Sequence, residues 1–247
     1  MSVLILALAA GAVTGLALGA LGGGGSVLTV PALIYLLGFT PSAATTASLV
    51  IVTLTSATAL SAHAREGTVR WRAGALFAAA GLIPAVLGGA VSGLLPPALL
   101  TGAFSVIAAL AAVRMLRPAA EPGAAPAGTG RITTAGAGLG AVTGVLGVGG
   151  GFLAVPALVN VVGLRMRAAV GTSLLVITAN SLAALLARAG TAQSLDWAVV
   201  APFAGAAVLG AWDGKRLAGR VSGGTLRRIF AWALLGVAAL MLLDVVL

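Results

Sequence analysis

The stretch LGGGGSVLTVPAL at residues 21–33 returns 125 residues later as LGVGGGFLAVPAL at residues 146–158. Between residues 11–38 and residues 136–163, 14 of 28 aligned positions are identical. A glycine tract that interrupts a hydrophobic segment at the same place in both halves is typical of membrane transporters, where it marks the binding site. The repeat therefore predicts a duplicated membrane protein and favours a carrier.

Composition excludes a soluble fold. The 247 residues are 60% hydrophobic and only 8% charged, with a mean hydropathy of +1.15, whereas a soluble domain has about 25% charged residues. Apolar runs of the roughly 20 residues that a membrane-spanning helix needs fill nearly the whole length. The net charge of +9 comes from Arg and Lys in short connections. Such charges fit the cytoplasmic ends of membrane helices better than a nucleic-acid surface.

Few residues could carry covalent or acid–base chemistry. The chain has no cysteine, one histidine and five carboxylates, which excludes disulfides and thiolate metal sites. We therefore expect no catalytic residue, no metal and no cofactor, and we do not expect an enzyme. His63 ends a predicted helix and is the candidate for proton coupling, although a histidine in such a place is more often a surface residue. Residues 1–21 lack the basic start of a secretory signal, so we expect a retained first membrane span.

Hydrophobic segments separated by turn residues predict the helices. Glycine costs about 1 kcal/mol in a helix interior, so the four glycines at 22–25 are expected to unwind the backbone. The Pro-, Gly- and Ala-rich stretch at 117–131 predicts a linker between a first repeat at 1–116 and a second at 132–247. The predicted helices are 2–19, 27–37, 42–62, 73–92 and 98–116, then 132–147, 152–163, 168–187, 197–212 and 225–246.

The basic residues orient the two repeats. With four crossings in each half, the two faces would carry seven basic residues each, against the usual positive-inside bias. With five crossings, 13 of the 14 basic residues fall on one face and only Arg188 on the other. An odd number of crossings inverts the second repeat. We thus expect an all-α, multi-pass membrane protein of two inverted repeats, each with four full transmembrane helices and a Gly-broken short helix. This makes eight to ten membrane segments, with the linker in the cytoplasm.

The glycine tracts are the candidate binding site. A helix that begins after such a tract presents unpaired N–H groups and the positive end of its dipole, which bind anions without a charged side chain. The alternative is that the glycines only permit tight packing, as the spacing of Gly11, Gly15 and Gly19, and of Gly136, Gly140 and Gly144, indicates for those positions. The candidates are Gly22, Gly24, Gly25 and Ser26 in the first repeat, and Gly147, Gly149, Gly150 and Gly151 in the second.

Uncharged polar side chains follow on the next helix of each repeat. They can donate to an oxyanion without the desolvation cost of a buried arginine. The alternative for any single Ser or Thr is a hydrogen bond within or between membrane helices. The candidates are Thr46 and Ser48 in the first repeat, and Thr172, Ser173 and Asn180 in the second.

Over essentially its full length, the chain resembles the TauE/SafE family, the sulfite exporter or toluenesulfonate uptake permease family. The resemblance rests on the duplicated Gly-rich segment ending in VPAL, on ATTASLVIV at 44–52 and AVGTSLLVI at 169–177, and on Trp71 and Trp197. It implies a prokaryotic inner-membrane carrier for sulfite or an organosulfonate.

Together these features favour a secondary transporter that moves a small anion, by resemblance sulfite or an organosulfonate, across the inner membrane by alternating access. The alternatives are an anion channel, a transporter of an unrelated small solute and, as the weakest, an intramembrane enzyme with a Ser26–His63 dyad. The sequence GGSVL lacks the flanking pattern expected of such a nucleophile. The expected partners are a small anionic substrate and the lipid bilayer, with no nucleic acid, and a homodimer is compatible with the sequence.

Overall fold

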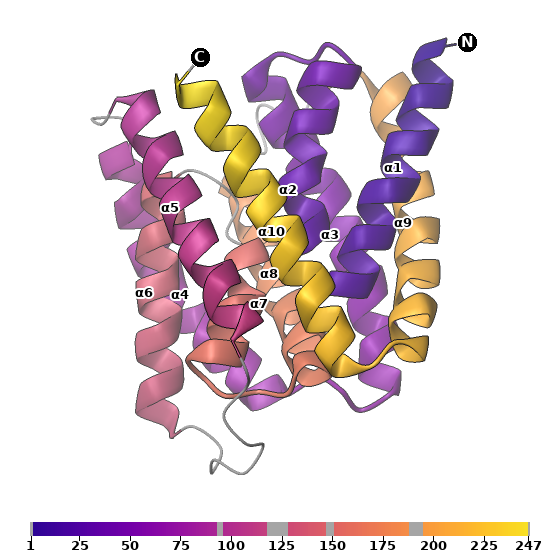
Figure 1. The fold of residues 1–247 in the computed structure, drawn as a ribbon. Coiled ribbons are helices and arrows are strands. Elements are labelled where there is room, and N and C mark those ends of the chain that lie inside the picture. The colour runs from indigo at the N-terminus through magenta and orange to yellow at the C-terminus, as the bar shows by residue number, and fades with distance from the viewer. Residues whose placement is uncertain (1, 93–95, 118–127, 147–150, 188–194, 247) are drawn as a thin grey trace.

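Helices make up nearly all of the computed structural model, which describes residues 2–92, 96–117, 128–146, 151–187 and 195–246, and these ranges contain no strand (Figure 1). The first half consists of α1 (Ser2–Leu21), α2 (Gly24–Pro31), the π-helical turn η1 (Ala32–Leu36), α3 (Pro41–Arg65), α4 (Trp71–Ser92) and α5 (Pro97–Leu116). The second half consists of α6 (Thr129–Leu146), α7 (Gly151–Asn160), α8 (Met166–Ala187), α9 (Trp197–Arg220) and α10 (Gly223–Val246). The order of long and short helices is the same in both halves.

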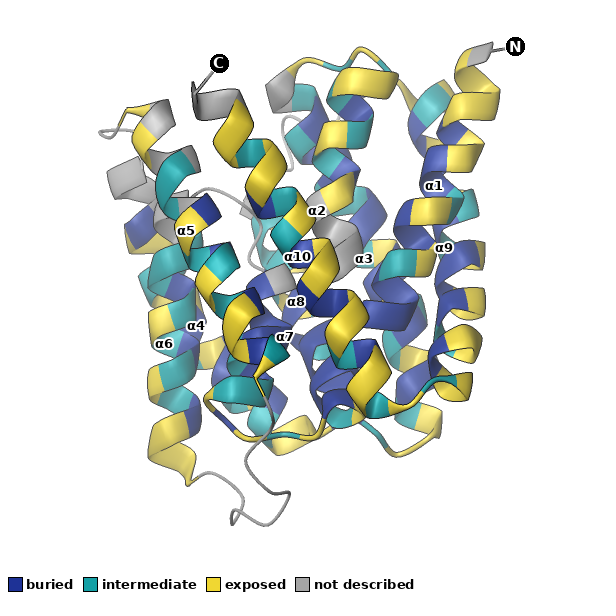
Figure 2. Cartoon of the chain, in the orientation of Figure 1, coloured by how far each residue is buried: buried dark blue, intermediate teal, exposed yellow. Residues whose placement is uncertain are grey.

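Six helices in the described ranges are long and apolar enough to cross a bilayer. They are Val3–Leu21, Ala43–Arg65, Trp71–Gly88, Met166–Leu186, Trp197–Arg220 and Gly223–Leu243, and α5 adds a shorter apolar stretch at Ser105–Leu116. Exposed residues lie on the outward sides of the peripheral helices (Figure 2), and they include large apolar side chains such as Ile83 and Leu209. The prediction of an all-α polytopic membrane protein is confirmed.

The helix pairs follow the duplication. The two most extensive contacts are those of α1 with α9 and of α4 with α6, and exchanging the two halves converts one into the other. The pairs α3 with α8, α5 with α10 and α2 with α7 are also in contact, and each is its own counterpart under that exchange. In Figure 1, α1 runs downward from the N-terminus, whereas its counterpart α6 runs upward. The arrangement is compatible with the inverted repeats expected from the basic residues.

Glycine ladders hold the two most extensive helix pairs together. A Cβ on Gly11, Gly15 or Gly19 would collide with the α9 backbone at Phe203, Ala207 and Ala211 respectively. On α6, a Cβ on Gly136 or Gly140 would collide with the α4 backbone at Phe77 and Gly81. Backbones can approach this closely only where side chains are absent. The packing role predicted for these glycines is confirmed, and Gly144 lies outside the residues whose side-chain positions are described.

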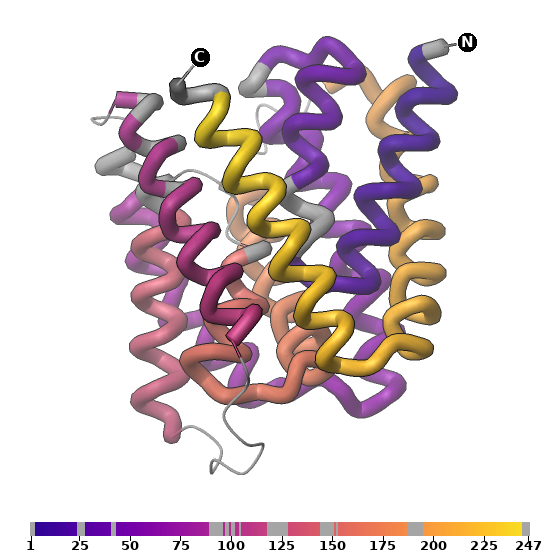
Figure 3. The backbone as a smooth tube through the Cα atoms, viewed as in Figure 1, coloured from indigo at the N-terminus to yellow at the C-terminus, as the bar shows by residue number. Residues whose placement is uncertain are grey.

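The chain reverses direction after α1. Gly22 has a φ of +76°, a backbone conformation that favours glycine, and α2 and η1 then return toward the end of the molecule where α1 begins (Figure 3). The break is shorter than predicted, because helix resumes at Gly24 rather than after the whole tract. Glycine lowers helix stability without forbidding helix, so packing decides.

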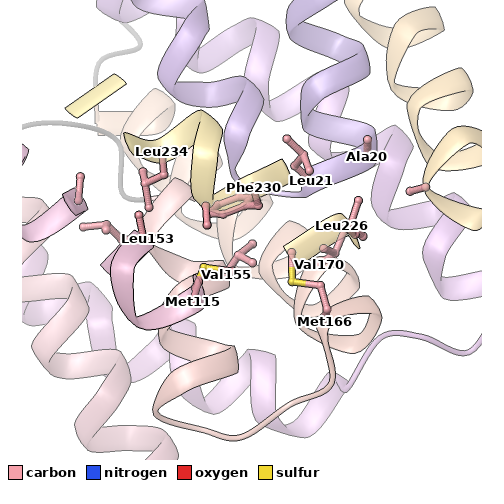
Figure 4. Packing of buried hydrophobic residues seen from close by; sticks show 14 of the residues in the cluster. Ala20, Leu21, Met115, Leu153, Val155, Met166, Val170, Leu226, Phe230 and Leu234 are labelled. Carbon is pink, nitrogen blue, oxygen red and sulfur yellow. The ribbon is translucent and has the colours of Figure 1, made fainter. Parts of the chain in front are cut away.

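An apolar cluster from both repeats surrounds this break. It joins the end of α1 to α5, α7, α8 and α10 through Ala20, Leu21, Met115, Leu153, Val155, Met166, Val170, Leu226, Phe230 and Leu234 (Figure 4). The non-helical backbone at Gly22 is thereby shielded by protein, as irregular backbone inside a membrane must be.

The basic segment after residue 212 differs from the prediction. The sequence predicted that the helix beginning at Trp197 ends at residue 212 and that the next helix begins at residue 225, with a basic connection between them. Instead α9 continues to Arg220, and α10 begins at Gly223. Long basic side chains at a helix end reach the polar interface while their stems stay on the helix, so Lys215, Arg216 and Arg220 do not require a loop.

Candidate functional site

The break after α1 brings residues of the two repeats together. Gly22 is buried, and a Cβ added to it would lie 2.6 Å from the Ser173 hydroxyl oxygen on α8 and 3.2 Å from Cγ2 of Val155 on α7. Its backbone N–H still donates to the Leu18 carbonyl at 2.8 Å, which closes the last turn of α1. Only glycine satisfies both the positive φ and the lack of space at this position.

Two short helices begin beside this contact. α2 starts at Gly24 and α7 at Gly151, and the two helices pack against each other. The predicted residues Gly24, Gly25 and Ser26 form the first turn of α2, while Gly151 is buried at the start of α7. Gly147, Gly149 and Gly150 lie outside the described residues. First-turn N–H groups of a helix have no partner within the helix.

The repeated serines have equivalent environments. Ser48 donates its hydroxyl to the Thr45 carbonyl at 2.8 Å, and Ser173 donates to the Val170 carbonyl at 2.8 Å. Both side chains are buried. Hydroxyl hydrogens rotate freely between acceptors, so either serine can turn toward a ligand and return to its own helix when the ligand leaves.

The remaining polar candidates on these helices differ from one another. Thr46 is buried. Thr172 is also buried, but its hydroxyl accepts a hydrogen bond from the Arg70 backbone N–H at 3.0 Å, so it fixes the start of α4 against α8. The Asn180 side-chain oxygen is buried and has no hydrogen-bond partner within the described part of the chain. Asn180 follows Ser173 by two helical turns, which places both residues on one face of α8.

His63 lies at the end of α3, beside Gly19 in the last turn of α1, three residues before the break at Gly22. The structure buries this side chain, with 6% exposure, although the sequence favoured a surface position. Its Nδ1 lies 3.2 Å from the Thr68 hydroxyl oxygen, and its Nε2 lies 3.5 Å from the Gly19 carbonyl. Beside it, Lys215 pairs with Glu66 at 2.6 Å. Sequence reasoning missed this network, because the contacts join segments far apart along the chain.

The chemistry at the break is that of uncharged donors. The described residues hold no cluster of three or more His, Cys, Asp or Glu side chains. What gathers there is backbone N–H groups at two helix starts, a hydroxyl and an apolar wall. Such donors recognise an anion through charge-assisted hydrogen bonds.

Two glycine-broken helix pairs that meet inside a bundle of membrane-spanning helices define a polytopic membrane protein with the architecture of a transporter. The family model described as "Sulfite exporter TauE/SafE" matches residues 7–241. The chain belongs to this family of membrane transporters.

Two relatives agree with this assignment. The chain is 36% identical over 244 residues to a "Probable membrane transporter protein" of Xylella fastidiosa strain 9a5c, an alignment that covers 95% of this chain and 93% of the relative. It is 35% identical over 244 residues to the protein of the same name in strain Temecula1, with the same coverage. No solved structure matches the chain.

Proposed function

We propose that this protein is a secondary transporter that carries a small anion, sulfite or an organosulfonate, across the inner membrane by alternating access. The contact between Gly22 and Ser173 carries this proposal. It joins the glycine tract of the first repeat to the hydroxyl-bearing helix of the second. A site built from both repeats can open to either side as the repeats move against each other.

In this proposal the anion binds to backbone N–H groups at the starts of α2 and α7. The hydroxyls of Ser48 and Ser173 and the amide of Asn180 complete the set of donors. None of these groups carries a formal charge, so the empty site leaves no buried charge uncompensated. A sulfite or sulfonate group offers three oxygens that can accept these bonds. His63 remains the candidate for proton coupling.

Uptake into proteoliposomes tests the proposal. Purified protein would be reconstituted and offered sulfite, toluenesulfonate, sulfate, chloride and sodium, each with and without a pH gradient. We expect saturable uptake of sulfite or toluenesulfonate and counterflow against unlabelled substrate inside. Flux that does not saturate and shows no counterflow would indicate a channel instead. Uptake restricted to sodium would contradict the anion assignment.

A further inference from the structure

Four hydroxyl residues lie where α3 and α8 cross. Thr53 and Ser56 on α3 have Thr178 and Ser181 as their counterparts, 125 residues later. The Thr178 hydroxyl donates to the Ser56 hydroxyl oxygen at 2.9 Å, which links the two repeats. Under exchange of the two halves, the counterpart of this pair is Ser181 with Thr53. That second bond is not formed, because Thr53 donates to the Leu49 carbonyl at 2.6 Å and no hydrogen bond among the described residues joins it to Ser181.

The two pairs are neighbours along the crossing of α3 and α8. α3 and α8 are antiparallel, since the segment after α3 meets the start of α8 through the bond from the Arg70 N–H to Thr172. In this register Ser56 faces Thr178 and Thr53 would face Ser181. Thr53 and Ser56 are three residues apart, or about 4.5 Å along the helix. A rocking of α8 on α3 about a point between the two pairs would close one pair and open the other.

Three of the four hydroxyls, those of Thr53, Ser56 and Thr178, have an acceptor in their own helix. Thr178 lies 2.7 Å from the Leu174 carbonyl, and the Ser56 hydroxyl lies 3.3 Å from the Thr53 carbonyl. Thr53 is already bonded to its own helix in this way. Breaking the bond across the crossing consequently leaves no polar group unsatisfied, so the two arrangements can have similar free energies.

We propose that Thr53, Ser56, Thr178 and Ser181 form a two-position hydrogen-bond switch that distinguishes the two access states of the transporter. The Ser56–Thr178 bond marks the state seen here, and a Thr53–Ser181 bond marks the opposite state. The inference rests on the proposed function, since it assigns a local contact to each end of an alternating-access cycle. Two equivalent arrangements of one packed interface are the kind of bistable element that such a cycle needs.

Disulfide trapping tests the switch, because the chain has no cysteine of its own. One protein would carry Ser56→Cys with Thr178→Cys, and another Thr53→Cys with Ser181→Cys. We expect the first pair to oxidise faster and the second pair to oxidise as well, in membranes without substrate. Each disulfide should stop uptake, and a reductant should restore it. Undiminished uptake by the oxidised first pair, or a reduced second pair that transports but never cross-links, would overturn the proposal.

A third substitution measures how the population shifts from the access state seen here toward the opposite state. Adding Ser56→Ala to the Thr53→Cys and Ser181→Cys protein removes the bond that holds the present state. We expect cross-linking of that pair to become about threefold faster, the usual size for one hydrogen bond between membrane helices. The matched control is Ser61→Ala, which removes a hydroxyl bonded only to the Thr58 carbonyl of its own helix at 2.7 Å. Equal cross-linking rates in the proteins with Ser56→Ala and with Ser61→Ala would refute the switch.

The two proposals fail in different ways. Cross-linking rates are measured without substrate, so an incorrect choice of anion leaves them unchanged. Absence of the switch, in turn, leaves saturable anion uptake by the unmodified protein intact.

Discussion

Gly22 is constrained both by its positive φ and by the lack of space for a Cβ atom. A comparison with Gly38 separates these two effects. Gly38 has a similar φ of +69°, but a Cβ on it would have no neighbour within 4 Å in the described ranges. Gly22→Ala should therefore abolish sulfite-dependent thermal stabilisation, because the methyl group meets the Ser173 hydroxyl at the candidate site. Gly38→Ala should lower stability by about 1–2 kcal/mol through backbone strain alone and keep that response. Equal thermal stabilisation of both folded variants by sulfite would show that the site does not lie at Gly22.

Asn180 offers a second test, in which stability and activity should change in opposite directions. Its buried side-chain oxygen has no hydrogen-bond partner among the described residues, and such a group costs about 1–3 kcal/mol. Asn180→Leu should thus raise the melting temperature while it lowers uptake at least tenfold. The control is Thr55→Val at the equivalent position of α3, where the hydroxyl donates to the Ile51 carbonyl at 2.6 Å. A stabilised Asn180→Leu protein with full uptake would show that the amide does not contact the substrate.

The sequence identified candidate residues that recur at equivalent positions in both halves. It missed residues whose contacts depend on segments far apart along the chain. Gly22 and Ser173 belong to motifs present in both halves, so they could be singled out as candidates, although their mutual contact could not be predicted. Thr172 belongs to the same motif, yet its hydroxyl accepts from the N–H of Arg70. The buried position of His63 likewise involves Thr68 and, on α1, Gly19, and no local pattern encodes these contacts.

Among the helical elements, α6 contains a matched pair of glycines for testing the packing ladders. A Cβ on Gly140 would collide with the α4 backbone at Gly81, whereas one on Gly138 would meet nothing within 4 Å. Gly140→Ala should destabilise the protein strongly, by about 2 kcal/mol or more, because α4 and α6 must move apart. Gly138→Ala should be neutral or stabilising by up to about 1 kcal/mol, the helix preference for alanine. Thermal unfolding in detergent measures both, and similar melting temperatures would contradict the close packing.

The starts of α3 and α5 followed from sequence because a proline begins each segment, whereas the glycine tract after α1 did not give the start of α2. α3 begins at Pro41 and α5 at Pro97, close to the predicted starts at 42 and 98. Where a charged segment can be either helix or loop, as at 213–220, hydropathy alone gave the wrong boundary. The π-helical turn at Ala32–Leu36 follows Pro31 inside the helix, a local irregularity that no periodic pattern predicts.

An inverted arrangement of the two repeats, as expected from the basic residues, predicts opposite sides of the membrane for equivalent loops. Single cysteines at Pro96, before α5, and at Ser222, before α10, lie in corresponding connections, and both side chains are exposed. We expect Pro96→Cys to react with a membrane-impermeant maleimide only from outside the cell, and Ser222→Cys only from the cytoplasmic side. Thr129→Cys, at the start of α6, should behave like Ser222→Cys. Reaction of Pro96→Cys and Ser222→Cys from the same side would rule out the inversion.

The exchange of helices between halves also constrains how the protein can be made. α1 ends at Leu21, but α9, the partner that fits its glycine ladder, begins only at Trp197. At the usual pace of synthesis, roughly 5–20 residues per second, α1 waits in the bilayer for about ten seconds or longer before that partner emerges. Neither half can complete its own packing, so the nascent chain depends on lipid and on the insertion machinery to keep α1 from pairing wrongly. Because helices of the first half pack against helices of the second, neither half can be lost without the other. This dependence would preserve the duplication once it had formed.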